Sequence, residues 1–115
     1  HYYRAMERSG WMRGIRTRTE LQHHVAEWQA NPQRTPFGYI ISMECADAVL
    51  HPDNIHEWHE LGLRAIGLTH YGANRYGGGT RCETGLAADA LPLLRNIDQL
   101  GIAVDLTHLS DPAFW

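Results

Sequence analysis

The sequence predicts an α/β fold built on a mostly parallel sheet, and three observations support this prediction. Three short apolar runs rich in β-branched residues begin at residues 39, 65 and 102. A segment with helical features separates each run from the next, which is typical of β-α-β units whose helices cover the sheet. The chain has 115 residues, whereas a complete (β/α)8 barrel needs about 200 or more. We therefore expect about three parallel strands with connecting helices that form part of a TIM-like (β/α)8 barrel.

The N-terminal part is predicted to be helical. Its first residues are mixed in character, but Thr17 and Glu20 have the spacing of a capping box, in which each side chain satisfies a free backbone N–H of the other. Apolar residues then recur at helical spacing, and Asn31-Pro32 ends the helix. The residues of the apolar stripe are Leu21, Val25 and Trp28.

The rest of the chain alternates strands and helices. The run 39–43 is predicted to be a buried strand, His51-Pro52-Asp53 to begin a helix that ends at Gly62, and 65–69 to be a second strand. A long glycine-containing loop over 71–85 precedes a helix over about 87–100, which ends at Gly101, and a third strand over 102–107. The expected inner face of the last helix consists of Leu91, Leu94, Ile97 and Leu100.

An open sheet of three strands has two unpaired edges, which is an unfavourable place for a fold to stop. We therefore expect residues 1–115 to be a single segment, the incomplete central portion of a barrel domain. A small three-layer α/β domain that is complete as it stands is the alternative.

Composition excludes several classes of protein. The chain is 43% hydrophobic and 20% charged with a formal net charge of −3, so a disordered, collagen-like or disulfide-rich protein is excluded. A mildly acidic chain lacks the basic surface that nucleic-acid binding needs, and no apolar run approaches the ~20 residues of a transmembrane helix. Cys45 and Cys82 have no CxxC spacing and are expected to be unpaired thiols. The compartment stays open, with the cytoplasm slightly favoured over export.

A residue able to bind a metal ion follows each predicted strand: Glu44, His70 and His108. Because the carboxyl ends of parallel barrel strands meet at one mouth, we expect these side chains to converge there. Carboxylate oxygen and imidazole nitrogen suit zinc or a similar divalent ion, and a carboxylate can bridge two ions that together activate a water. His70 suits either metal or substrate contact, and a histidine packed in the core is the alternative for His108.

The other chemistry-bearing residues are predicted to have no place in this site. Gly77-Gly78-Gly79 does not open a helix as a dinucleotide-binding motif would, so we expect a mobile loop that forms a rim for substrate. Asp105, inside a strand, is expected to orient a neighbour. Surface or packing roles are expected for His23, His24, His51, His56 and His59.

Three segments together resemble the renal (membrane) dipeptidase family, peptidase family M19. They are Ile41-Ser42-Met43-Glu44, residues 61–70 with Asn74, and residues 100–110. Their order and spacing match that family over most of the chain, most closely its bacterial branch with a glycine-rich segment after the His70 strand.

The resemblance implies a zinc-dependent dipeptidase with two zinc ions on a TIM-like barrel. By that similarity Glu44 bridges the two ions, His108 binds one of them, and His70 is not a ligand but binds the dipeptide substrate and its tetrahedral intermediate. The resemblance leaves a homodimer of the full-length protein open. A related barrel amidohydrolase acting on another amide or ester, and a non-catalytic barrel binding protein, are the alternatives.

The sequence departs from the family pattern in two ways. Nothing in residues 1–43 matches the family's upstream His-x-Asp ligand pair, and its Ser-His ligand and catalytic aspartate are expected downstream of Trp115. Cys45 stands where the family commonly has glycine. Two ligands are too few for two zinc ions, so we expect the isolated segment to have no peptidase activity.

Overall fold

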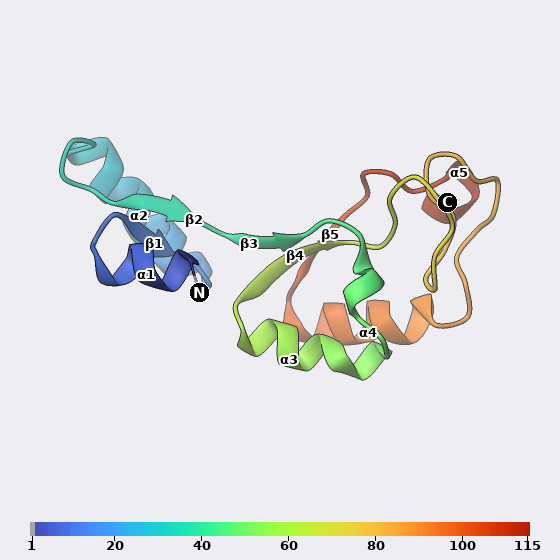
Figure 1. Ribbon diagram of the computed structural model, residues 1–115. Helices are drawn as coiled ribbons and strands as arrows, with labels where there is room; N and C mark the ends of the chain where they lie inside the picture. Colours follow the sequence, from blue (N-terminus) through green and yellow to red (C-terminus); the bar gives the residue numbers. More distant parts are fainter. Residues whose placement is uncertain (1) are drawn as a thin grey trace. The chain divides into compact units, whose positions relative to one another are not determined.

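The computed structural model describes residues 2–115, which divide into two compact units. The first unit ends at Ile41, and the second runs from Ser42 to Trp115. A two-stranded sheet has the order β1-β2, and a three-stranded sheet has the order β3-β4-β5 (Figure 1). Each unit is described by itself below.

The first unit is formed around a short parallel pair of strands. Met12 lies opposite Phe37 and Gly14 opposite Tyr39 in this pair. The elements are α1 (Tyr2–Arg8), β1 (Met12–Gly14), α2 (Arg18–Ala30) and β2 (Phe37–Tyr39). The capping box at the start of α2 is confirmed, because Thr17 accepts from the Glu20 backbone N–H and Glu20 accepts from the Thr17 backbone N–H.

The predicted buried strand over 39–43 is wrong in two respects. The run is divided between the end of β2 and all of β3, and Ile40, between them, belongs to neither strand. It is also not buried, since Ile40 is 48% exposed in this structure. An apolar run predicts burial only where further layers cover both faces of the strand, and the described residues do not supply that cover. The three-residue strand β1 was not predicted.

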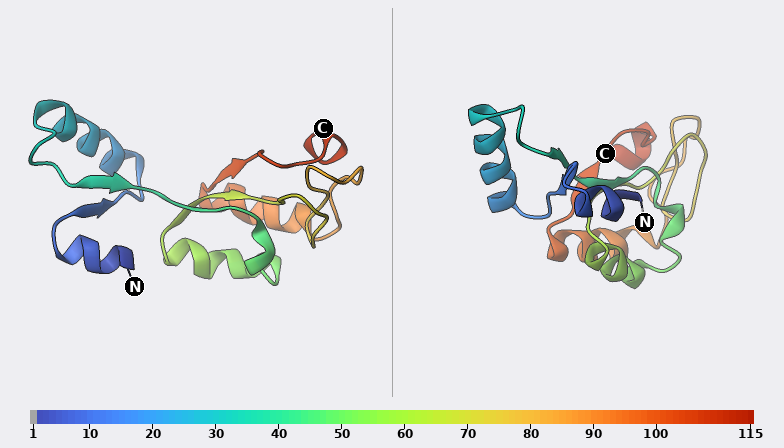
Figure 2. Two further views of the ribbon diagram at one scale, coloured as in Figure 1. Left: turned by 45° about the horizontal axis from the view of Figure 1, so that its top comes forward. Right: turned by 60° about the vertical axis from the view of Figure 1, so that its left-hand side comes forward.

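The second unit carries most of the α/β architecture. Its elements are β3 (Ile41–Met43), the short 3₁₀ helices η1 (Ala46–Ala48) and η2 (Pro52–Asn54), α3 (Ile55–Glu60), β4 (Leu63–Gly67), α4 (Ala90–Leu100), β5 (Ala103–Asp105) and α5 (Asp111–Phe114). β4 and β5 are parallel, with Ala65 opposite Ala103. The helices α3 and α4 lie side by side on one face of the sheet (Figures 1 and 2).

The hydrophobic core lies between that face of the sheet and the two helices. Its largest fully buried aliphatic side chains are Ile55, Leu63, Ile66, Leu68, Leu93 and Ile97. The predicted inner face of α4 is partly wrong, because Leu91 is 56% exposed and Leu93 is fully buried. Ala90, Leu93 and Ile97 form the buried stripe instead.

The predicted start of the helix at His51-Pro52-Asp53 and both predicted helix ends around this core are confirmed, whereas α4 begins at Ala90 and not at about residue 87. The His51 side chain accepts from the Asp53 backbone N–H, and Pro52 occupies the first turn of η2, which leads into α3. Gly62 and Gly101 follow α3 and α4 with φ of +108° and +65°. Glycine takes such conformations at no steric cost, so both helices can end where the sequence predicts.

The predicted loop over 71–85 is irregular, but hydrogen bonds and buried side chains hold it against the rest of the unit. Tyr76 is fully buried, and its hydroxyl donates to the backbone carbonyl of Val49. The Asn74 side chain accepts from the backbone N–H groups of Tyr76 and Gly77 and donates to the Leu68 carbonyl at 2.7 Å. The loop is therefore anchored next to the end of β4. Gly77, Gly78 and Gly79 are buried, so these glycines do not form an exposed segment, and a substrate rim at this loop stays a prediction.

Candidate metal centre

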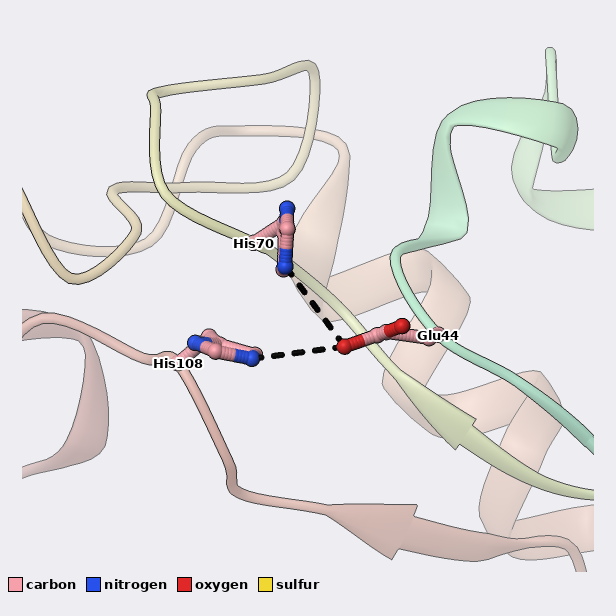
Figure 3. Close-up of side chains that lie close together, drawn as sticks. All are labelled: Glu44, His70 and His108. Carbon is pink, nitrogen blue, oxygen red and sulfur yellow. Dashed lines mark ion pairs between the residues drawn. The ribbon is translucent and has the colours of Figure 1, made fainter.

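Three neighbouring strands position the side chains of the candidate site. Glu44 follows β3 directly, and His70 and His108 each lie three residues beyond the last residue of β4 and β5. Because the strands are neighbours in one sheet, the residues that leave their carboxyl ends meet at one edge (Figure 3). The predicted convergence of these three side chains is confirmed.

A single carboxylate oxygen lies between the two imidazoles. Glu44 Oε1 is 3.3 Å from His108 Nε2 and 3.5 Å from His70 Nε2 (Figure 3). Glu44, His70 and His108 each offer one potential metal-ligand atom, and these three atoms lie within 4.8 Å of one another. Glu44 is the most open of the three at 71% side-chain exposure, followed by His70 at 43% and His108 at 21%.

The two imidazole rings pack against each other and against Tyr71. The rings of His70 and His108 meet edge to face with centroids 4.5 Å apart. The centroid of the Tyr71 ring is 4.4 Å from that of His70 and 5.3 Å from that of His108. The Arg81 guanidinium lies over the Tyr71 ring, 5.0 Å from its centroid. Such packing restricts the ring orientations, which helps to keep both Nε2 atoms toward Glu44.

The backbone of His108 adopts an unusual conformation that is held by hydrogen bonds. Its φ is +69°, a value that L side chains rarely adopt. The buried Thr69 hydroxyl donates to the His108 carbonyl at 3.1 Å, and the Thr80 hydroxyl lies 3.1 Å from His108 Nδ1. A strained conformation at a candidate site is maintained by its surroundings, and these two threonines supply part of that support.

Cys45 lies beside the site without joining it. Its Sγ atom accepts a hydrogen bond from Asn74 Nδ2 at 3.5 Å and is not among the grouped donor atoms. Burial raises the pKa of the Cys45 thiol, so the thiolate that metals prefer is disfavoured. Cys45 and Cys82 are both free thiols, as predicted.

Asp105 shapes the turn that leads to His108. Its carboxylate accepts from the Thr107 backbone N–H at 2.9 Å, and hydrogen bonds from the Thr107 side chain and backbone hold the pKa of Asp105 below its usual range. Asp105 therefore acts on the local backbone, in line with the expected orienting role.

The donor set fits a divalent metal ion. One carboxylate oxygen and two imidazole nitrogens are ligands that zinc takes readily, and they lie at one open edge of the sheet. Across residues 2–115, this is the only group of three such side chains with that proximity. Among residues 2–115, five other histidines lie outside this group: His24 is buried, His51 caps η2, and the others are His23, His56 and His59.

Sequence reasoning missed the residues around the site rather than those within it. Tyr71 and Thr80 contact the imidazoles from an irregular loop, and Thr80 is 28 positions away from His108 in the chain. No periodic pattern marks such contacts. The glycines before Thr80 were the one available signal, because glycine often marks a close approach of backbones.

A family comparison matches nearly the whole chain. Residues 11–115 match the model of the membrane dipeptidase family, peptidase family M19. A curated relative, an uncharacterized protein from the PQQ-III 3′ region of Acinetobacter calcoaceticus, is 27% identical over 85 residues, which cover 66% of this chain and 27% of that protein. Within the described part of the chain, no helix has both the length and the apolar character to cross a membrane.

Solved structures share the fold. A metallo peptidase from Rhodobacter sphaeroides, whose crystal structure holds a phosphinate mimic of the dipeptide L-Ala-D-Ala, is 26% identical with a TM-score of 0.75 and covers 98% of this chain. Dipeptidase AC, a metallo peptidase of family M19, is 28% identical with a TM-score of 0.79 and covers 96%. A probable dipeptidase from Pseudomonas aeruginosa, 16% identical with a TM-score of 0.78, covers 97% and shares the fold.

These likenesses also define how much of such a protein the chain represents. The chain spans 33% and 34% of the first two solved structures and 27% of the curated relative. Its α/β fold with parallel strands matches a partial segment of the barrel of M19 metallohydrolases.

Proposed function

The chain belongs to the membrane dipeptidase family, peptidase family M19, and from that premise we propose that the protein carrying it is a zinc-dependent dipeptidase. The convergence of Glu44, His70 and His108 on one edge of the sheet is the observation that carries this proposal. We place the chain as a single segment, the central portion, of the barrel domain of that protein.

The proposed metal ligands are Glu44 and His108. Glu44 is the most exposed of the three side chains and has two oxygens, so it is suited to bridge two zinc ions. The Nε2 atom of His108 faces Glu44 Oε1, and His108 would bind one of the two ions through this nitrogen. When bound, the zinc pair supplies Lewis acidity and lowers the pKa of a water toward neutrality. The remaining ligands come from parts of the protein outside this chain.

His70 is proposed to act on the substrate. Its side chain is 43% exposed, twice as open as that of His108, and its Nε2 points to the same place as the metal donors. An imidazole N–H there stabilises the negative charge that develops on the carbonyl oxygen of the scissile peptide bond. Packing against Tyr71 and His108 holds the ring ready for this role.

The proposed substrate is a dipeptide with small side chains. The crystal structure of the Rhodobacter sphaeroides relative holds a phosphinate mimic of L-Ala-D-Ala, and we take that dipeptide as the starting point for this protein. The first substrates to assay are therefore L-Ala-D-Ala and L-Ala-L-Ala.

Zinc binding by the 115-residue chain tests the ligand assignment. Isothermal titration calorimetry should show zinc binding that weakens at least tenfold in Glu44→Gln and His108→Ala, because each removes one ligand. The control His56→Ala removes an exposed histidine outside the group and should bind zinc as the unmodified chain does. Equal affinity in all four proteins contradicts the assignment.

Hydrolysis by the full-length protein tests the reaction. His70→Ala should lower kcat by about 100-fold or more while keeping the zinc content, since it removes a group that acts in the transition state. His108→Ala should lose zinc and activity together. Turnover of other amides with no dipeptide hydrolysis would favour a related amidohydrolase, and zinc binding without any turnover would favour a non-catalytic binding protein.

The isolated chain is proposed to be inactive. Two ligands do not hold two zinc ions, so incubation with zinc and dipeptides should release no amino acid above a blank. Robust turnover by the 115-residue chain would contradict this proposal.

A further inference from the structure

We propose that Thr80 is a positioning residue of the metal centre, which fixes the His108 ring in the tautomer that leaves Nε2 free to bind a metal ion. This inference rests on the proposed function, because it assigns a role toward the metal that His108 would bind. It also assigns a role to the buried glycines before Thr80, Gly77 to Gly79, which have no part in the proposed reaction.

The two ring nitrogens of His108 face different partners. Nδ1 lies 3.1 Å from Thr80 Oγ1, and Nε2 lies 3.3 Å from Glu44 Oε1. A histidine that binds a metal through one nitrogen commonly donates its other N–H to an oxygen, which sets its tautomer and orientation. Thr80 supplies an oxygen at that position.

The hydroxyl proton of Thr80 has another acceptor within reach. Thr80 Oγ1 lies 3.4 Å from the His108 backbone carbonyl, to which it can donate. With its proton directed there, the hydroxyl oxygen accepts from Nδ1–H. The lone pair of the neutral ring is then on Nε2, where a metal ion can bind. Without a metal ion, the Glu44 carboxylate competes with Thr80, because it accepts from Nε2–H.

The backbone holds Thr80 in place independently of its side chain. Its N–H donates to the His70 carbonyl at 3.0 Å, and the next residue, Arg81, donates to the Tyr71 carbonyl at 2.9 Å. On the other side, Ser110 N–H donates to the Gly78 carbonyl at 3.0 Å. The loop thus lies between the segments that carry the two site histidines.

Gly79 makes this approach sterically feasible. A Cβ atom added there would lie 2.0 Å from the His70 carbonyl oxygen and 2.6 Å from that of Gly72. No side chain fits such a contact, so glycine at this position lets Thr80 reach both histidines.

The test uses the 115-residue chain labelled with ¹⁵N in its histidines. Because the Glu44 carboxylate accepts from Nε2–H when no metal ion is bound, the tautomer is measured at pH 8 in a Glu44→Ala chain, where the His108 ring shifts should report Nδ1–H. Thr80→Val removes the hydroxyl at similar volume, and in the Glu44→Ala chain it should shift His108 toward Nε2–H. In the chain that keeps Glu44, it should weaken zinc binding by about 10- to 100-fold. Thr80→Ser keeps the hydroxyl and should restore both.

The control and the opposing outcomes separate this inference from the proposed function. Thr19→Val alters an exposed threonine of α2 and should change neither readout. If the unmodified chain fails to bind zinc but Thr80→Val still changes the tautomer, the positioning role stands and the proposed function fails. An Nδ1–H tautomer that persists in a folded Thr80→Val chain, or a loss that Thr80→Ser does not restore, overturns the positioning role.

Discussion

At the scale of single residues, Cys45 adopts a backbone conformation that suits glycine better. Its φ is +70°, in the region where a Cβ atom causes strain. We predict that Cys45→Gly stabilises the chain by about 0.5–1 kcal/mol, because relief of strain exceeds the loss of the weak contact with Asn74. The midpoint of urea unfolding measures this.

Cys82 provides the matched control for that substitution. It is also a free thiol, but its φ is not positive. Cys82→Gly should bring no gain in stability, since it only adds freedom to the unfolded chain. Equal effects of the two substitutions would show that strain at Cys45 is not the cause.

The ligand-type residues of the site were predictable from sequence, whereas their surroundings were not. Glu44, His70 and His108 each follow a strand, and the rule that parallel strand ends converge brings them together without any coordinates. Thr80 and Tyr71 reach the same site from a loop with no period, through contacts that depend on the folded path of the backbone. Local sequence patterns therefore do not predict such contacts.

At the scale of elements, the buried face of α4 can be tested with a pair of leucines. Leu93 is fully buried and Leu91 is 56% exposed. Leu93→Ala should cost about 2–5 kcal/mol of stability through lost burial and a cavity, and Leu91→Ala should change it by less than about 0.5 kcal/mol. Chemical denaturation of both variants measures the difference, and similar losses would contradict the observed face.

The start of α2 should respond to acid. The backbone N–H of Arg16 donates to Glu20 and, with contributions from Thr17, holds the pKa of that carboxyl below its ordinary value of 4.5. Because this pKa is lowered in the folded state, the stabilisation is present above about pH 4.5 and is lost as the pH falls through the lower folded value. The amide shift of Thr17 should therefore change with a midpoint below 4.5.

Glu20→Gln isolates this effect from other carboxylates. The amide of glutamine does not titrate, so the acid step at Thr17 should disappear while the helix remains. A step that persists in this variant would assign it to another group.

Element prediction succeeded where a short-range signal existed. The capping box of α2 and the glycines that end α3 and α4 are local interactions, and all three were found at the predicted positions. The division of the run 39–43 between two sheets was not predictable, because strand pairing joins residues far apart in sequence. The face of α4 was misjudged because several leucines compete for it, and only packing against α3, η2 and β5 selects among them.

At the scale of the whole molecule, the two units differ in how much core they contain. Among residues 2–41 of the first unit, the buried residues are Ile15 and His24, whereas the second unit contains the fully buried aliphatic set around β4 and α4. Amide exchange slows where opening exposes much buried apolar surface. We predict that the slowest amides lie in β4 and α4 and that those of α2 exchange much faster, as NMR hydrogen exchange would show. Equal protection in α2 and α4 would instead indicate one cooperative unit.

Zinc should act on only one of these units. Glu44, His70 and His108 all belong to the unit from Ser42 to Trp115, at the ends of strands that form its sheet. A ligand that binds only the folded state stabilises it by mass action, by about 2.7 kcal/mol at a free concentration of 100 times Kd. Exchange in β4 and α4 should therefore slow by up to about 100-fold with zinc and recover with a chelator, while α2 exchanges as before. Glu44→Gln should lose this response, and slowing in α2 would show that zinc binds elsewhere or couples the units.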